Sequence, residues 1–294
     1  MKIENNHIAS LHPSVRETLD KTDDERIEFL FDDKWIPYPA ANAVIDKMER
    51  LLKMPKKLRM PGMLIVGETN NGKSSIAEYF CRIHTPIDQE EAIQYPVINV
   101  LAPDGPDLNG LYGEILYQMM APYPSSARTA KKEELVRYYF DRLGVRMLII
   151  DEIHHLLSGP IVKQKQFMNG VKNLSNHLRI PIVLAGTKDA LRATSTDPQI
   201  SNRFTPVFLP KWKVDQDYVS LLASIETLLP LKKASGLASN KQIALEIFNK
   251  TGGNIGEVLN LIYLATELAI RSGSERVTMD EIKGCPYDVP PSEK

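Results

Sequence analysis

Residues 67–74 read Gly-Glu-Thr-Asn-Asn-Gly-Lys-Ser and fit the pattern G-x-x-x-x-G-K-[ST] of a phosphate-binding loop (P-loop). An apolar strand-like run, 63–66, precedes them, and an amphipathic helical pattern, 75–83, follows. In that context the loop N–H groups and a helix N-terminus surround phosphate oxygens, Lys73 reaches the β- and γ-phosphates, and the Ser74 hydroxyl ligates Mg²⁺. The alternative is a plain glycine-rich turn. The expected nucleotide-binding residues here are Gly67, Glu68, Thr69, Asn70, Asn71, Gly72, Lys73, Ser74 and Ser75.

A second chemical motif occupies residues 147–152, where four apolar residues are followed by Asp151 and Glu152. An ATPase needs an Asp at a strand tip to hold Mg²⁺ and a neighbouring group that positions the attacking water. We therefore expect Asp151 to be a metal ligand, like Ser74, and Glu152 to be catalytic. The pattern is weak alone and gains weight from the preceding P-loop.

Strand patterns alternate with helical patterns as far as residue 212, which predicts βαβ units and a mostly parallel, five-stranded α/β sheet. Ligands of such sheets bind at the carboxyl ends of the strands, so Thr187, which ends the strand at 181–187, is also an expected site residue. The other expected strands are 63–66, 96–101, 147–152 and 206–209, and 86–94 is expected to be a polar connection. The expected helices are 25–31, 42–54, 75–83, 108–120, 130–143, 215–229, 240–249, 254–271 and 278–283.

The domain prediction follows from this change of pattern, because only helices are expected after residue 213. The expected parts are an N-terminal appendage at 1–34, a nucleotide-binding α/β domain at 35–212, a small all-helical domain at 213–284 and a flexible tail at 285–294.

The composition is that of an ordinary globular protein, with 294 residues, 43% hydrophobic and 25% charged. No apolar run approaches the ~20 residues that span a membrane, and the N-terminus lacks the apolar core of a secretory signal. The two cysteines, Cys81 and Cys285, predict neither a disulfide framework nor a cysteine metal site, so a reducing cytoplasm is the expected location. With a net charge of −1, nucleic-acid binding would need a local basic patch.

The order of P-loop, Asp-Glu pair, polar strand tip, Asn-Arg-Phe at 202–204 and helical lid resembles AAA+ ATPases. Within that class, four segments narrow the match: Trp-Ile-Pro-Tyr-Pro at 35–39, Asp-Glu-Ile-His-His-Leu-Leu-Ser-Gly at 151–159, Leu-Ala-Gly-Thr at 184–187 and Ser-Asn-Arg-Phe at 201–204. These segments look like the TniB family. These proteins are ATP-dependent transposon regulators related to TnsC-type proteins. The resemblance covers roughly residues 20–270.

This resemblance implies an AAA+ fold with sheet order 5-1-4-3-2, the strands being numbered along the chain. It implies homo-oligomers, as rings or helical filaments, that ATP assembles on double-stranded DNA, and it implies a DDE transposase and a TniQ-type target-selection protein as partners. Lys73 and Ser74 match Walker A, and Asp151 and Glu152 match Walker B. Thr187 matches sensor 1, and Arg203 matches the arginine finger that reaches a neighbouring subunit's γ-phosphate. Trp35, Ile36 and Tyr38 are added as nucleotide-binding residues.

One departure from the AAA+ pattern concerns the lid. Such lids often carry a sensor-2 Arg three residues after a Gly, and here Gly256 follows Gly253 at that spacing. The pattern therefore predicts ATP binding more directly than ATP turnover, and a nucleotide-locked scaffold with little turnover is the alternative function. A DExH helicase is disfavoured, because the helical region that follows the sheet leaves no room for a second α/β domain.

DNA contacts are expected from residues 153–188, which hold five basic residues and no Asp or Glu. Phosphate contacts are additive and blind to sequence, so an acid-free basic stretch suits them. The alternative is a helix that simply carries its lysines outward. The expected contacts are Lys163, Lys165 and Lys172, with Arg128, Lys131 and Lys132 as a second group. Adjacent residues on an α-helix face different ways, so His154 and His155 are not expected to form a metal pair.

Overall fold

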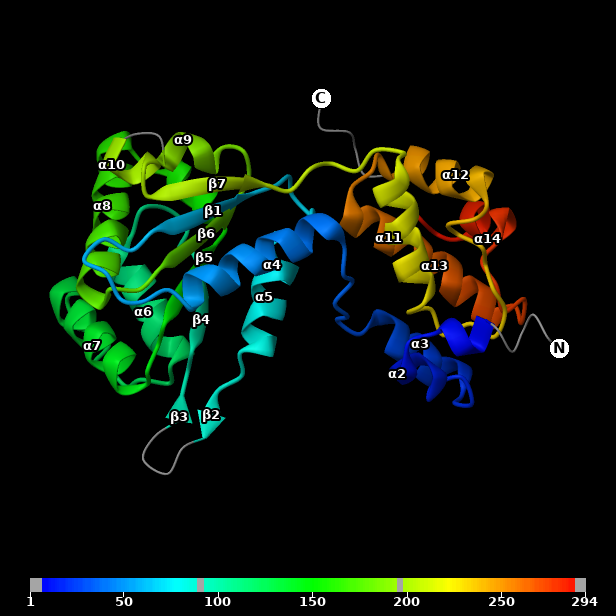
Figure 1. The fold of residues 1–294 in the computed structure, drawn as a ribbon, viewed down its shortest axis with the longest axis horizontal. Helices are drawn as coiled ribbons and strands as arrows, with labels where there is room; N and C mark the ends of the chain where they lie inside the picture. Colours follow the sequence, from blue (N-terminus) through cyan, green and yellow to red (C-terminus); the bar gives the residue numbers. More distant parts are fainter. Residues whose placement is uncertain (1–6, 89–92, 195–197, 289–294) are drawn as a thin grey trace. The chain divides into compact units, whose positions relative to one another are not determined.

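The computed structural model describes residues 7–88, 93–194 and 198–288, and the chain divides into two compact units (Figure 1). One unit is Ala40–Pro210 and contains the sheet; the other combines Met1–Pro39 with Lys211–Lys294 and is helical. This division differs from the predicted one, in which residues 1–34 stood apart and 35–39 belonged to the nucleotide-binding domain. Most of the predicted tail, 289–294, lies outside the described residues.

The sheet unit is built on a parallel sheet with the strand order β4-β5-β6-β1-β7. Numbered along the chain, these five strands follow the predicted order 5-1-4-3-2, and the α/β AAA+ fold is confirmed. Every residue of β1, β5 and β6 is buried, as expected for parallel strands covered by helices on both faces. The strands are β1 (Gly62–Val66), β4 (Val97–Leu101), β5 (Met147–Asp151), β6 (Ile182–Gly186) and β7 (Phe204–Phe208).

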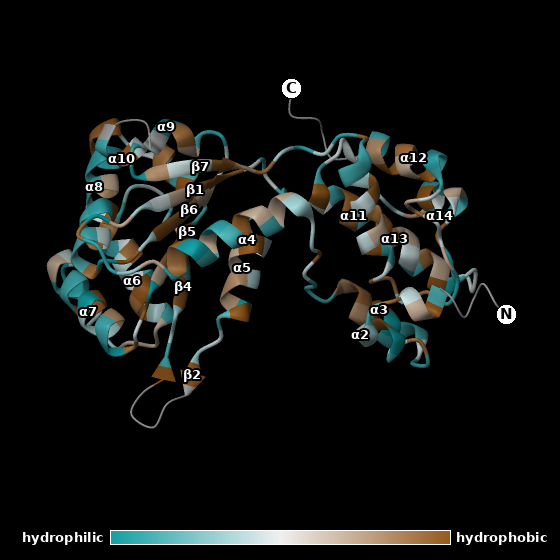
Figure 2. Cartoon of the chain, in the orientation of Figure 1, coloured by the Kyte–Doolittle hydropathy of each residue, from teal (hydrophilic) through white to brown (hydrophobic). Residues whose placement is uncertain are grey.

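Helices cover this sheet with apolar stripes. In α5, Ile76, Ala77 and Phe80 are buried on one side, and in α8 the buried stripe includes Phe167 and Leu174. Burial of each large side chain of this kind contributes about 1.5–3 kcal/mol to folding. In Figure 2 the solvent-facing side of α7 is largely hydrophilic, whereas hydrophobic residues gather in strands such as β5. The helices are α4 (Pro39–Leu52), α5 (Lys73–Ile83), α6 (Leu108–Gln118), α7 (Thr129–Arg142), the 3₁₀ helix η1 (Ile153–Ser158), α8 (Ile161–Leu178), α9 (Ala190–Thr194) and α10 (Pro198–Ser201).

A small antiparallel hairpin follows α5 and was not predicted. Its strands are β2 (Ile87–Asp88) and β3 (Ile93–Gln94), paired through Ile87 and Gln94. The expectation of a plain polar connection at 86–94 was therefore wrong for its two ends. Strands of two residues are too short to show an alternating pattern in the sequence.

The helical unit contains α2 (Pro13–Arg16) and α3 (Asp23–Phe31) from the N-terminal segment. Thr22 and Glu25 form a capping box at the start of α3. The C-terminal helices are α11 (Gln216–Glu226), α12 (Lys241–Thr251), α13 (Ile255–Arg271) and α14 (Met279–Gly284). None of the helices that the structure describes is long and apolar enough to cross a membrane.

Arg26 explains why the N-terminal segment belongs to this unit. Its side chain is fully buried and donates hydrogen bonds to Glu275 Oε2 at 2.5 Å and to the Pro230 carbonyl at 2.6 Å. The His12 N–H adds a 2.9 Å hydrogen bond to the Thr227 carbonyl. A buried guanidinium is stable only when its N–H groups are paired, so these contacts hold α3 to the C-terminal helices.

Candidate nucleotide-binding site

The P-loop joins β1 to α5, which begins at Lys73. Gly72 caps this helix with a φ of 81°, a left-handed conformation that a residue with a Cβ rarely adopts. At the other end of the loop, the Gly67 N–H donates to the Gly186 carbonyl at 3.1 Å. The loop is therefore attached to β6 where it leaves the sheet and turns sharply where α5 starts, as phosphate binding requires.

Asn71 attaches the same loop to the end of β7. Its side chain is only 4% exposed, and its Nδ2 group donates to the carbonyls of Leu209 and Pro210 at 3.3 and 3.4 Å. Asn71 occupies a variable position of the motif, and the structure shows it supporting the loop through its side chain.

Lys73 is buried at the centre of the loop, and its Nζ group donates to the Glu68 carbonyl at 2.8 Å. Burial lowers the pKa of Lys73, and the nearby carboxylates of Glu152 and Asp151 oppose that shift. The cation thus lies between the P-loop and the Asp-Glu pair. A phosphate bound in the loop would pair with this desolvated charge, which makes the interaction stronger than it would be in water.

Asp151 ends β5 in register with Leu101 of β4 and is 1% exposed. Its Oδ1 atom accepts a 2.7 Å hydrogen bond from the backbone N–H of Glu152. Glu152 itself is half-buried with a φ of 54°, and such a conformation in a residue other than Gly is a strained one that often marks functional sites. This turn directs the chain from β5 into η1.

Thr187 directly follows β6 and is half-buried. Gly186 before it permits a close approach of β6 to η1, because a Cβ there would lie 3.0 Å from Ile153 Cγ2. Gly67, Asp151 and Thr187 thus lie at the carboxyl edge of three adjacent strands, as the sequence predicted. Ser74, in the first turn of α5, is exposed. The Ser74 hydroxyl and the Asp151 carboxylate are oxygen donors of the type that Mg²⁺ prefers, so the residues present fit that ion.

Arg203 lies at the opposite edge. It precedes β7, and its carbonyl accepts a 2.9 Å hydrogen bond from the Gly62 N–H at the start of β1. The guanidinium is 5% exposed and donates to the Lys172 carbonyl at 3.1 Å and to Asn176 Oδ1 at 2.7 Å, both on α8. Burial, and then the nearby Arg59, lowers the pKa of Arg203. The structure thus places Arg203 in contact with its own α8, and the trans role stays a prediction.

Trp35, Ile36 and Tyr38 belong to the helical unit. Ile36 and Tyr38 are buried, and the Tyr38 ring meets Trp212 edge-on with 5.2 Å between ring centroids. Burial raises the pKa of Tyr38 to about 12. These contacts show an ordered aromatic cluster, and its role in nucleotide binding stays a prediction.

The comparison with protein families decides which AAA+ group the chain represents. Residues 26–214 match the family model described as "TniB: Bacterial TniB protein". The chain belongs to the TniB family. TniB proteins are transposon-associated AAA+ ATPases, and this TniB-family chain is accordingly an ATP-binding ATPase.

Solved structures agree on the fold. The ORC2 protein of Aeropyrum pernix, in ADPNP–ADP complexes, matches with a TM-score of 0.64 and 16% identity over 87% of this chain and 70% of that one. Cdc6p of Pyrobaculum aerophilum matches with a TM-score of 0.62 and 16% identity over 86% and 68%. The Hsp104–ADP complex of S. cerevisiae matches with a TM-score of 0.54 and 19% identity over 85% and 41%. No curated protein matches.

The predicted DNA-binding residues of this TniB-family protein lie on α7, directly before it, and on α8. Lys163 and Lys165 are exposed at the start of α8, and among the described residues neither has an ion pair or hydrogen-bond partner for its ammonium group. They are two residues apart and so face different sides of the helix. Lys172 is on the same side as Lys165 and donates to Gln199 Oε1 at 3.2 Å.

The second basic group, at the start of α7, is partly occupied by contacts within the protein. Lys131 pairs with Glu134 at 3.0 Å. Lys132 donates to the Asn109 carbonyl at 3.2 Å and lies over the Tyr123 ring, 4.8 Å from its centroid. Arg128 is exposed. Lys163, Lys165 and Arg128 are therefore the predicted residues most available to an external phosphate.

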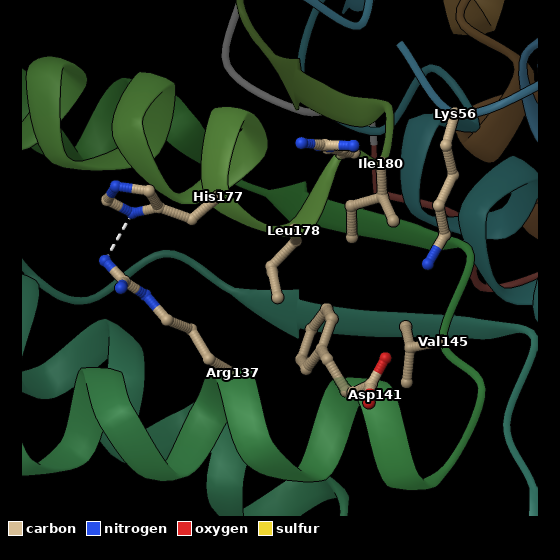
Figure 3. A pocket seen from close by; sticks show the side chains of 9 residues that line it. Lys56, Arg137, Asp141, Val145, His177, Leu178 and Ile180 are labelled. Carbon is tan, nitrogen blue, oxygen red and sulfur yellow. Dashed lines mark hydrogen bonds between the residues drawn. The ribbon is translucent and has the colours of Figure 1, made fainter. Parts of the chain in front are cut away.

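Two cavities flank these helices. One, of about 490 Å³, lies between α6, α7 and α8 and is lined by Thr129 and Arg137 of α7 and by Gln166 and His177 of α8. The other, of about 420 Å³, lies where Arg137 contacts His177 and includes Lys56 (Figure 3). Because it is also lined by residues just before β5 and β6, it opens at the edge of the sheet away from the P-loop.

Sequence reasoning missed the proximity of His154 and His155. Their ring centroids lie 5.0 Å apart in the 3₁₀ helix η1, and one ligand atom of each ring lies within 4.8 Å of the other and of the Glu152 carboxylate. Pro160, which follows shortly, was the available signal for a short segment.

Proposed function

We propose that this chain is an ATP- and Mg²⁺-dependent regulator of DNA transposition that forms homo-oligomers on double-stranded DNA. In this role it recruits or activates a DDE transposase and works with a TniQ-type target-selection protein. Membership of the TniB family supports the link to transposons. The observation that carries the ATP-driven part is that Lys73, Asp151 and Glu152 lie together at one edge of the sheet.

Each residue has a role in this proposal. Lys73 would neutralise charge on the β- and γ-phosphates, and Ser74 and Asp151 would hold Mg²⁺, which would neutralise further phosphate charge. Glu152 orients the attacking water, and Thr187 lies beside it at the next strand tip. The predicted arginine finger, Arg203, acts on the nucleotide of a neighbouring subunit.

DNA binding is proposed from the exposed cations at the starts of α7 and α8. Similar folds support it: the ORC1 protein of Aeropyrum pernix and the ORC of Drosophila were solved with DNA. One subunit offers few phosphate contacts, so its affinity for DNA is low. Assembly multiplies those contacts, and binding becomes tight when ATP drives oligomer formation.

A salt titration of duplex DNA binding tests this proposal. Lys163→Ala/Lys165→Ala is compared with the wild type and with Lys47→Ala/Lys57→Ala, which removes two exposed lysines elsewhere in the sheet unit. We expect ATP-dependent binding that weakens steeply with salt in the wild type and control, and a shallower slope in the α8 variant, by about 0.9 per lost phosphate contact. A wild-type slope in the α8 variant would count against α8 and favour Arg128. Tight binding by the nucleotide-free monomer would contradict ATP-gated assembly.

A nucleotide-locked scaffold with little turnover is the second candidate. It is favoured by Gly256, which occupies the sensor-2 position and instead donates its N–H to the Asn254 side chain at 3.1 Å as part of the α13 cap. ATP turnover measured with and without DNA separates the two functions: turnover that DNA accelerates supports the first, and none in either condition supports the second.

A further inference from the structure

Two imidazoles lie beside the carboxylate of Glu152. The ligand atoms of Glu152, His154 and His155 all lie within 4.8 Å of one another, and His154 Nδ1 is 3.0 Å from Glu152 Oε2. All three side chains are half-buried. Glu152 and His155 are three positions apart, and residues at that spacing lie one above the other along a 3₁₀ helix such as η1, which follows the left-handed Glu152.

In each of the two imidazoles, one ring nitrogen lacks a hydrogen-bond partner within the described part of the chain. The Nδ1 atoms of His154 and His155 are shielded from solvent and have no hydrogen-bond partner among the described residues. His154 Nδ1 is close to the Glu152 carboxylate, but the angle between the two groups does not allow a hydrogen bond. A buried polar atom left in this way destabilises the protein, because it has lost its hydration without gaining a partner. One cation bound between the three residues would satisfy both nitrogens and the carboxylate together.

We propose that Glu152, His154 and His155 form a binding site for a divalent transition-metal ion of the Zn²⁺ type, separate from the Mg²⁺ of the nucleotide. Two imidazole nitrogens and a carboxylate oxygen are a donor set that Zn²⁺ uses, with bonds of about 2.0–2.2 Å. Tetrahedral coordination at that length separates ligands by about 3.3 Å, so the 3.0 Å pair already fits and His155 needs a small side-chain rotation. Asp104 Oδ1, 3.7 Å from His155 Nδ1 on an exposed side chain, is placed to be a fourth ligand.

The type of ligand atom also distinguishes the proposed site for a Zn²⁺-type ion from the site for Mg²⁺. Imidazole ligands favour Zn²⁺, Cu²⁺ or Ni²⁺, whereas Mg²⁺ prefers oxygen ligands such as Ser74 and Asp151. A transition-metal ion would hold the Glu152 carboxylate, so it would also slow ATP turnover. That consequence rests on the proposed function, whereas metal binding does not.

Calorimetric titration of the tag-free, nucleotide-free full chain with Zn²⁺, in millimolar Mg²⁺, tests the site. We expect one Zn²⁺ per chain in the wild type and at least about tenfold weaker binding in His154→Ala and in His155→Ala. His177→Ala, which removes an exposed imidazole on α8, and Cys81→Ser, which removes a half-buried thiol, are controls that should bind as the wild type does. Titration with Co²⁺ should give the visible absorption of a tetrahedral centre in the wild type and not in the two variants.

Two results would overturn the site: no binding by the wild type at micromolar Zn²⁺, or unchanged binding in both His154→Ala and His155→Ala. If either alanine variant lacks the wild-type circular dichroism spectrum, His154→Gln and His155→Gln take its place. In a separate measurement, Zn²⁺ should inhibit ATP turnover in the wild type more than in His155→Ala. A chain without turnover would contradict the proposed ATPase cycle, and the titration would still decide the metal site.

Discussion

The guanidinium of Arg203 donates a 2.7 Å hydrogen bond to the side-chain oxygen of Asn176 on α8. Together with the bond to the Lys172 carbonyl, this contact attaches the start of β7 to a helix of the same subunit. An arginine that acts on a neighbour's nucleotide must turn outward, so the bonds to α8 compete with that role. The same helix carries the lysines proposed to bind DNA.

The first prediction separates the two roles of Arg203. Arg203→Ala should bind ATP as the wild type does and lose turnover by about 10³-fold or more, because an arginine finger acts at the transition state. Asn176→Ala, which removes only the partner on α8, should retain turnover. Mixing Arg203→Ala with Lys73→Ala should restore part of the turnover, since each subunit lacks a different half of the site. Equal losses of thermal stability in both variants, with normal turnover per folded chain, would instead assign Arg203 a structural role.

Lys73→Ala should weaken ATP binding by about tenfold or more, because the buried ammonium pairs directly with phosphate charge. Fluorescent-nucleotide titration measures the effect. Lys47→Ala, on an exposed face of α4, is the control. Equal ATP affinity in Lys73→Ala and the wild type would remove the P-loop from the binding site.

Glu152→Gln should keep ATP affinity and slow hydrolysis by about 10²-fold or more, because an amide cannot accept a proton from water as a carboxylate does. The variant should therefore collect as an ATP-bound oligomer, visible by light scattering. Glu78→Gln, on the exposed side of α5, controls for the change of charge. Hydrolysis at the wild-type rate in Glu152→Gln would assign the catalytic role to another group.

Arg26→Met should destabilise the helical unit by about 3 kcal/mol or more, because it leaves the Glu275 carboxylate without its buried partner. Chemical denaturation followed by circular dichroism measures the loss. Arg271→Met, which removes exposed ion pairs to Glu267 and Asp24, should change the free energy of unfolding far less.

The same ion pair predicts a pH dependence. Burial alone would raise the pKa of Glu275, but the hydrogen bonds from Arg26 and from the Lys232 N–H outweigh it, and the pKa is lowered. The contribution of Glu275 to stability is therefore present above the unfolded-state pKa of about 4.3 and is lost as the pH falls through the lowered folded-state value. Unfolding midpoints measured from neutral pH down to this acidic range should fall in the wild type and fall less in Arg26→Met. Parallel curves would show that other carboxylates cause the acid sensitivity.

The sequence alone determined which residues form the candidate nucleotide site, and its resemblance to AAA+ proteins implied the strand order. Gly67, Lys73, Asp151 and Thr187 are each read from a local pattern of a strand followed by a polar tip, and parallel βαβ connections carry such tips to one edge. Local patterns also predicted most helices, since an apolar stripe repeats every few residues along one segment.

Tertiary structure decided the contacts between distant segments. Nothing in the local pattern around Arg26 shows that it pairs with Glu275, 249 positions away, and this contact joins the N-terminal segment to the C-terminal helices. Arg203, just before β7, likewise acquires Asn176 as a partner only when it folds against α8. His155 also lies near Glu152 because residues 153–158 form the 3₁₀ helix η1, in which residues three positions apart lie one above the other. Packing between segments fixes these relationships because burial forces each polar group to find a partner, and the sequence shows the group without the neighbour that will surround it.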